Sequence, residues 1–156
     1  MFGLFKSKPV DPVDYFSEEE KQIIVRAIGK AEQRTSGEIR IYIEGNCTAE
    51  DPVLRAKELF DSLNMHQTST RNGVLFYLAM VDRKLAIFGD EGIHEKVGDT
   101  FWNEQVSKIL ALFKQDKYVT GIEEVIHAIG EALQTHFPYD EKTDSNELPD
   151  DIVFGK

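Results

Sequence analysis

The stretch that decides the fold is the apolar run VLFYLAMV at residues 74–81, which follows Arg71-Asn72-Gly73. It contains no charged side chain, and such a run is typical of a strand that is covered on both faces in the middle of a sheet. A short polar break at residues 82–84 separates it from a second apolar run, LAIF at residues 85–88. The pair predicts a β-hairpin that ends at Gly89.

Upstream of this run, residues 38–44 alternate between apolar and polar side chains, with Ile39, Ile41 and Ile43 on one face. This period of two predicts a half-buried strand. A polar loop and then apolar side chains at helical spacing in residues 53–63 predict a helix after that strand. Strand, helix and strand in this order form a crossover unit, which would make the strands at 38–44 and 74–81 parallel.

Three further helices are predicted. Ser17 with Glu20 three residues later reads as a capping box that opens the first helix. Apolar side chains keep helical spacing from residue 93 to 113, with a break near Gly98. Thr120 with Glu123 reads as a second capping box, so the last helix is predicted to begin there and to end at residue 138, a proline.

These elements predict an α/β fold, a three-layer α/β/α sandwich around a small mixed β-sheet of about four strands. We assign residues 1–16 to an N-terminal extension, 17–138 to one domain and 139–156 to an acidic, flexible tail. The tail holds six acids and the short apolar segment at residues 152–154, which could serve as a docking motif.

Composition limits the function classes. The chain has 156 residues and a net charge of −10, which argues against nucleic-acid and anionic-membrane binding and favours cations as partners. Its single cysteine excludes an intrachain disulfide. Neither a signal peptide nor a run of about 18 apolar residues is found, so we expect a cytoplasmic monomer without stable membrane insertion.

No catalytic residue and no organic cofactor can be assigned. The chain lacks the Gly-x-Ser-x-Gly elbow, the phosphate-binding P-loop and the Gly-x-Gly-x-x-Gly fingerprint. The four histidines are scattered and form no His-Glu-x-x-His pair, which argues against a zinc protease site.

What remains is a carboxylate-rich region. The predicted hairpin places the exit of its second strand at the end of the sheet where the other two strands begin. That end would gather residue 38, the loop at 67–72 and the acidic loop at 89–99. Hard divalent cations bind such carboxylates together with neutral oxygens. The candidate metal ligands are Asp90, Glu91, Asp99, Glu38, Asn72 and Thr68.

Two alternatives stay open on the residues alone. The acidic stretch at 89–99 also fits a plain solvated loop. The opposite end of the sheet offers a second cluster of acids, Glu44, Glu50, Asp51 and Asp82.

Four short motifs carry a family resemblance: TSGEI at 35–39, RNGVLF at 71–76, DRK at 82–84 and GDEGI at 89–93. Their order and spacing resemble the TPM domain family, named for a thylakoid lumen protein, a photosystem II repair protein and a nematode receptor modulator. The resemblance implies an α/β/α fold, divalent cation binding at the end of the sheet and, in plant members, acid phosphatase activity. By matched position it points to Asp90 and Asp99, whereas Glu91 is added on its chemistry.

Three functional hypotheses follow. In the leading one, one or two Ca²⁺ or Mg²⁺ ions clamp two neighbouring loops and reshape a surface for an unknown protein partner. The alternative is a weak metal-assisted acid phosphatase, in which Arg71 would orient the phosphate. The third is an interaction protein that acts through its acidic tail.

Overall fold

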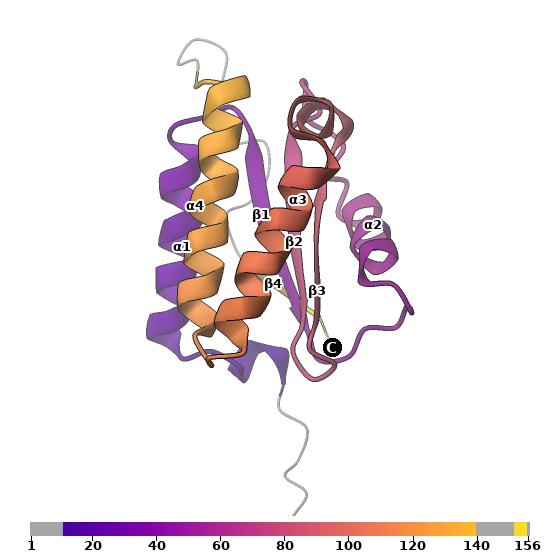
Figure 1. Cartoon of the computed structure of the whole chain (residues 1–156), viewed down its shortest axis with the longest axis vertical. Coiled ribbons are helices and arrows are strands. Elements are labelled where there is room, and N and C mark those ends of the chain that lie inside the picture. Colours follow the sequence, from indigo (N-terminus) through magenta and orange to yellow (C-terminus); the bar gives the residue numbers. More distant parts are fainter. Residues whose placement is uncertain (1–10, 140–151, 156) are drawn as a thin grey trace, which may run out of the picture.

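The computed structural model describes residues 11–139 and 152–155. They form an α/β sandwich in which one mixed, open sheet lies between helices, as predicted (Figure 1). A 3₁₀ turn, η2 (Pro12–Asp14), precedes the sandwich. The elements of the sandwich are α1 (Glu18–Glu32), β1 (Glu38–Glu44), α2 (Pro52–Ser62), β2 (Gly73–Ala79), β3 (Lys84–Gly89), α3 (Glu91–Phe113), α4 (Tyr118–His136) and β4 (Ile152–Phe154).

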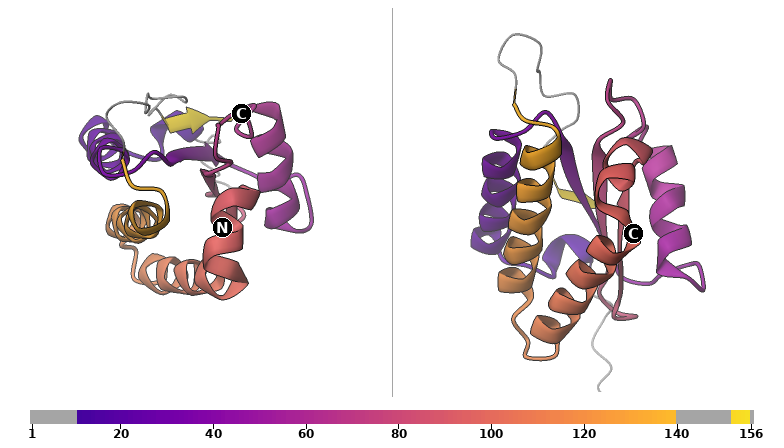
Figure 2. Two further views of the ribbon diagram at one scale, coloured as in Figure 1. Left: turned by 90° about the horizontal axis from the view of Figure 1, so that it is seen from above. Right: turned by 45° about the horizontal axis from the view of Figure 1, so that its top comes forward.

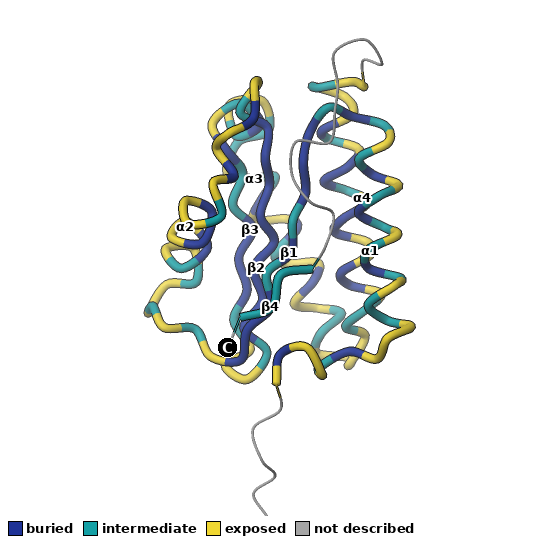
Figure 3. The backbone as a smooth tube through the Cα atoms, turned by 180° about the vertical axis from the view of Figure 1, so that it is seen from behind, coloured by how far each residue is buried: buried dark blue, intermediate teal, exposed yellow. Residues whose placement is uncertain are grey.

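The sheet has the strand order β3-β2-β1-β4. Strands β1 and β2 are parallel with Glu38 opposite Gly73, and β2 and β3 are antiparallel with Val74 opposite Gly89. The predicted crossover and hairpin are therefore confirmed. All seven residues of β2 are buried, as a central strand covered on both faces requires (Figure 3).

The two faces of the sheet are covered unequally. Helices α1, α3 and α4 lie on one face, and α2 lies alone on the other (Figure 2). Alternate residues of each strand enter the two cores because successive side chains of a strand point to opposite faces. Phe76 and Ile41 thus pack among α1, α3 and α4, whereas Leu75 and Tyr77 pack against α2.

Two local sequence signals for helix boundaries are confirmed by the structure. The capping box at α1 is confirmed, since Ser17 accepts from the Glu20 amide and Glu20 accepts from the Ser17 amide. The break in α3 is also confirmed, because Gly98 has φ of 75° between two helical segments.

The predicted start of the last helix is wrong. Helix α4 begins at Tyr118, and its N-cap residue Lys117 makes no side-chain cap. The chain reverses directly after α3 through Asp116, which has φ of 59°. The Tyr118 ring then packs edge-on against Phe113 at 4.9 Å between centroids, so tertiary contact starts the helix before the local signal at Thr120.

Part of the prediction of a flexible tail at 139–156 is also wrong. Ile152–Phe154 forms β4, which pairs in parallel with β1, and the Gly155 amide donates to the Ile43 carbonyl at 2.8 Å. The physical reason is that β1 would otherwise be an edge strand with unpaired backbone groups. Residues 140–151 and 156 of the predicted tail lie outside the described residues.

The domain also extends N-terminal of residue 17. Phe16, which we assigned to the N-terminal extension, is 5% exposed and belongs to the larger core. Within residues 11–139 and 152–155, no helix combines the length and hydropathy needed to cross a lipid bilayer.

Candidate functional site

The predicted gathering of three segments at one end of the sheet is confirmed. β1 and β2 start side by side at this end, and β3 finishes there against the start of β2. The Asp90 amide donates to the Gly73 carbonyl at 2.9 Å, and the Gly92 amide donates to the Arg71 carbonyl at 2.8 Å. The segment after β3 is thus hydrogen-bonded to the segment before β2.

This contact is very close. A Cβ atom added at Gly92 would lie 2.1 Å from the Thr70 carbonyl oxygen and 2.6 Å from that of Arg71. Only glycine allows the backbone of residues 70–71 to approach the first turn of α3 so closely.

The acidic segment at 89–99 is not a loop, which corrects our prediction. Gly89 ends β3, Asp90 is the N-cap of α3, and the helix runs from Glu91. The Asp90 carboxylate accepts from the Glu91 amide at 2.8 Å. Because aspartate is among the best N-cap residues, a helix starts where the abundance of glycine and acid predicted a loop.

Asp90 is the centre of the site. It is 4% exposed, and its two oxygens accept from Arg71 Nε at 2.7 Å and Arg71 Nη2 at 2.8 Å. This bidentate pair is the geometry that arginine and carboxylate favour. The hydrogen bond to Asp90 is the main cause that raises the pKa of Arg71 above its ordinary value.

Arg71 is held less firmly than Asp90. Its side chain is 42% exposed and also contacts Glu91, with 3.3 Å between Nη1 and Oε1. Arg71 adopts φ of 54°, a left-handed conformation that turns the chain sharply before β2. A buried carboxylate is therefore neutralised by a guanidinium at the surface.

Three more of the predicted ligands lie at the same end of the sheet. Glu38, Asn72 and Thr68 are all buried. The Asn72 amide nitrogen Nδ2 donates to Ser36 Oγ at 3.2 Å, and the Asn72 backbone amide donates to Thr68 Oγ1 at 3.3 Å. The side-chain oxygen Oδ1 of Asn72 is buried without a hydrogen-bond partner in the part of the chain that the structure describes.

Asp99 lies apart from the buried group. Its side chain is 87% exposed, and its Oδ1 lies 3.6 Å from Nε2 of His94. His94 Nδ1 in turn accepts from Trp102 Nε1 at 3.0 Å. This bond leaves Nε2 to carry the proton of the neutral ring, so His94 is oriented toward Asp99.

The six predicted ligands thus form two groups. Asp90, Glu91 and Asp99 line a cleft of about 830 Å³ over the edge strand β3, together with Arg71. The second group, Glu38, Asn72 and Thr68, does not line it. Across residues 11–139 and 152–155 no three histidine, cysteine or acidic side chains lie close enough together to hold a metal ion.

Comparison with known proteins identifies the family. A family model described as the TPM domain matches residues 9–132. The chain belongs to the TPM domain family. This TPM domain is similar to the BA42 protein of the psychrophilic bacterium Bizionia argentinensis, whose solution structure matches with a TM-score of 0.83 and 39% identity over 91% of this chain and 97% of that chain.

Two more distant structures share the fold of this TPM domain. The N-terminal domain of the cg2496 protein from Corynebacterium glutamicum matches with a TM-score of 0.59 over 82% of this chain and 85% of that chain. A P. gingivalis N-terminal domain matches with a TM-score of 0.67 over 84% and 86%. Both are 14% identical to this chain and show the fold alone. No curated protein matches the chain.

The second acidic cluster of the TPM domain is used structurally. Glu44 is buried and accepts from Arg55 Nε and Nη2, both at 2.9 Å, and from the Tyr77 hydroxyl. Burial and Glu44 raise the pKa of Tyr77 above its ordinary value of 10.0. Asp51 caps α2 by accepting from the Val53 amide at 2.9 Å.

Asp82 ties the β2–β3 turn to the loop after β1. It accepts from Asn46 Nδ2 at 2.9 Å and from the Cys47 amide at 2.7 Å, and these bonds lower its pKa.

Sequence reasoning missed how Arg71 and Arg55 are used. Arg71 was expected only to orient a phosphate, and it proves to be the partner of Asp90. The two residues are 19 positions apart, and no local pattern pairs side chains at such a separation. The signal available was a lone arginine beside a predicted acidic cluster.

Proposed function

We propose that this TPM domain is a divalent-cation-responsive binding module in which Ca²⁺ or Mg²⁺ competes with Arg71 for the Asp90 carboxylate. The observation that carries the proposal is the buried Asp90 carboxylate, which is paired with the guanidinium of Arg71. Because the Arg71 side chain is partly exposed, it can move away into solvent. A guanidinium and a divalent cation are alternative partners for the same oxygens, so one can replace the other.

The surrounding donors fit a hard cation. Ca²⁺ prefers carboxylate and carbonyl oxygens and tolerates irregular geometry, whereas Mg²⁺ demands a near-octahedral set. The unpartnered Asn72 Oδ1 is a buried acceptor that a cation or a water molecule would satisfy. Asn72 stands in sequence between Arg71 and Gly73, which both bond to the 90–92 segment. Glu91 would add a second carboxylate from the same helix turn.

The exchange would change the cleft. Arg71 lines the cleft and bonds to Asp90 at its wall. Its release would free a positive side chain toward the cleft and leave the ion to hold residues 67–72 against the start of α3. This is how ion binding would alter a surface for a protein partner.

The experiment is a calorimetric titration of chelator-treated protein with Ca²⁺ and with Mg²⁺. Wild type should bind Ca²⁺ with a dissociation constant at or below the millimolar range, and Asp90→Asn should abolish binding. Asparagine still caps a helix, so this variant removes the charge and keeps the helix start. Asp51→Asn is the matched control, because it makes the same change at the N-cap of α2 and should bind as wild type does. Lack of Ca²⁺ binding by wild type, or equal binding by Asp90→Asn, would refute the proposal.

One observation favours a metal-assisted phosphatase as second candidate. Arg71 lines the same cleft as Asp90, Glu91 and Asp99, so a phosphate in the cleft would meet a guanidinium beside the acids. Hydrolysis of p-nitrophenyl phosphate that requires added metal and is lost in Asp90→Asn would support it. Turnover that Asp90→Asn leaves unchanged would contradict it.

A further inference from the structure

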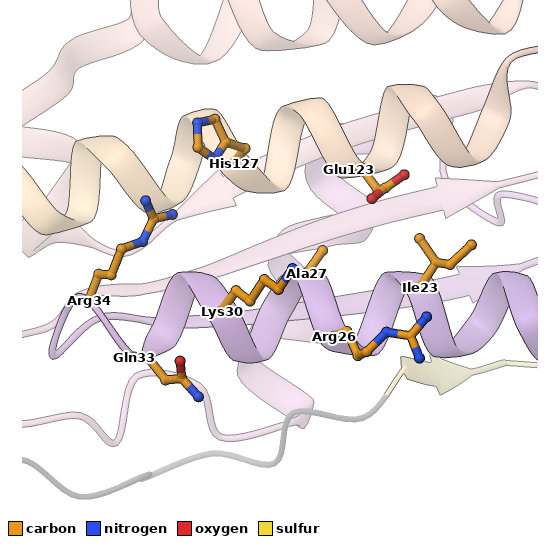
Figure 4. Close-up of a pocket in the computed structure, with 8 residues that line it drawn as sticks. All are labelled: Ile23, Arg26, Ala27, Lys30, Gln33, Arg34, Glu123 and His127. Atoms are coloured by element: carbon orange, nitrogen blue, oxygen red, sulfur yellow. The ribbon is translucent and has the colours of Figure 1, made fainter.

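A second surface, remote from the cleft, has the opposite character to the rest of the chain. A groove of about 600 Å³ runs between α1 and α4 (Figure 4). Helix α1 contributes Arg26 and Lys30, and Arg34 follows four residues after Lys30, just past the C-cap residue of the helix. Ile23 and Ala27 add apolar side chains between them.

The cations of this groove have no acidic partner among the described residues. Arg26, Lys30 and Arg34 form no ion pair within residues 11–139 and 152–155, whereas Lys21, Arg55 and Arg71 each bind a carboxylate. The chain carries 28 acids against 18 basic residues, and this groove brings three basic side chains together.

Helix α4 adds little opposing charge to the groove. Glu123 is the one acidic side chain among the eight residues that line it. His127, also from α4, lies 2.7 Å from Glu131, measured from Nε2 to Oε1. The groove is therefore a positive strip on an acidic protein.

We propose that this groove binds an extended acidic segment of a partner protein. Four residues of α-helix rise about 6 Å, and two residues of extended chain span about 6.6 Å. Acidic side chains at every second position of an extended peptide would therefore meet Arg26 and Lys30 in turn, and Arg34 follows just past the end of α1. Gln33 at the rim offers an amide for the peptide backbone, and Ile23 and Ala27 offer contact for an apolar side chain.

The arrangement favours such a peptide over other anions. The three cations are spread along the chain from Arg26 within α1 to Arg34 past its end, which is more than one phosphate group can span. None of the eight lining residues is Phe, Tyr or Trp, whereas sites for single-stranded nucleic acid use such side chains as platforms on which bases stack. This groove shares no lining residue with the cleft beside Asp90, so the proposal of peptide binding does not depend on the proposed ion response.

The test is fluorescence anisotropy with a labelled decapeptide of alternating glutamate and serine, added to the full chain at low salt. Binding should saturate and weaken as salt is raised, because exposed charges are screened. Arg26→Glu combined with Lys30→Glu should weaken binding at least tenfold. Lys108→Glu combined with Lys114→Glu makes the same change of charge in α3 and at its C-cap, and should have less than a twofold effect.

A second peptide tests the spacing. It has the same composition, with five glutamates in one block followed by five serines, and consecutive side chains of an extended block point to opposite sides. It should bind several-fold more weakly than the alternating peptide.

Three results would overturn the proposal. The first is equal binding of the two peptides, which would indicate non-specific attraction. The second is tighter binding of a decamer of single-stranded DNA. The third is a tenfold gain in peptide affinity when Asp140, Glu141, Asp144 and Glu147 are replaced by their amides, which would identify the chain's own acidic segment as the occupant.

Discussion

At the scale of single residues, Arg71 decides whether the ion site is available. Its ion pair with Asp90 must break before a divalent cation can bind the carboxylate. This ion pair is weak because its arginine is 42% exposed to water, so Arg71→Gln should tighten Ca²⁺ binding by only about fivefold. Calorimetric titration measures this change.

Arg55→Gln is the control for Arg71→Gln. Arg55 makes the same bidentate contact with a buried carboxylate, Glu44, at the opposite end of β1. It should lower stability without changing Ca²⁺ affinity. Weaker Ca²⁺ binding in Arg71→Gln would mean that Arg71 supports the site and does not compete for it.

Tyr77 gives a prediction about alkaline pH. Its hydroxyl is buried and donates to Glu44, which raises its pKa above 10.0. The folded state therefore keeps a proton that the unfolded state loses near pH 10. This contribution to stability is complete below pH 10 and is lost as the pH rises through the folded-state pKa.

Tyr77→Phe should lower the free energy of unfolding by about 2 kcal/mol at pH 7, because Glu44 loses a donor. It should also flatten the decline in stability above pH 10. Urea unfolding at pH 7 and pH 11 compares the two proteins. A decline of the same steepness in both would show that Tyr77 does not carry the effect.

At the scale of elements, the break in α3 depends on Gly98. No atom lies within 4 Å of a Cβ added there, but its φ of 75° is costly for any residue with a Cβ. Gly98→Ala should therefore lower the free energy of unfolding by about 1 kcal/mol. A Cβ added at Gly29 also meets no atom within 4 Å, and Gly29 lies within helix α1. Gly29→Ala should therefore raise the free energy of unfolding by up to about 1 kcal/mol. Chemical denaturation of both variants checks the signs, and a stabilised Gly98→Ala would contradict the account.

Strand β4 gives a prediction about truncation. A chain that ends at residue 151 lacks β4 and exposes the edge of β1. Loss of three partly buried apolar side chains and their backbone bonds should lower the free energy of unfolding by about 2 kcal/mol. A chain that ends at Gly155 is the control and should match the full chain in urea unfolding. Equal stability of the two truncated chains would mean that β4 adds nothing.

Elements set by local chemistry could be predicted from the sequence. Ser17 and Glu20 satisfy each other's backbone amides, and the uncharged run that begins at residue 74 supplies the covered strand β2, which ends at Ala79. Elements set by distant contacts could not. Thr120 carries a capping signal, yet packing of Tyr118 on Phe113 starts α4 earlier. Ile152–Phe154 becomes a strand only because β1 has a free edge.

The candidate site follows the same division. Its place at one end of the sheet follows from the crossover and the hairpin, so it could be predicted. That Asp90 is paired with Arg71 could not be predicted, because this contact depends on how residues 71 and 90 meet in space. The acidic stretch could also not be recognised as a helix start, since an N-cap aspartate and a loop aspartate look alike in sequence.

At the scale of the whole molecule, the fold separates a fixed frame from the candidate ion site. The strands are held by two apolar cores, one on each face of the sheet. The site lies where residues 67–72 meet the start of α3, and these segments are joined by a few hydrogen bonds and by the ion pairs of Arg71 with Asp90 and Glu91. Ion binding should therefore order this end and leave the cores unchanged.

Amide hydrogen exchange with and without Ca²⁺ tests the ion response most directly. Wild type should gain protection from exchange at residues 67–72 and 90–99. Protection of β1, β2 and the C-terminal end of α4 around Leu133 should not change. The same measurement on Asp90→Asn should show no gain. Absence of any change in wild type, or a change spread evenly over the whole chain, would contradict the account.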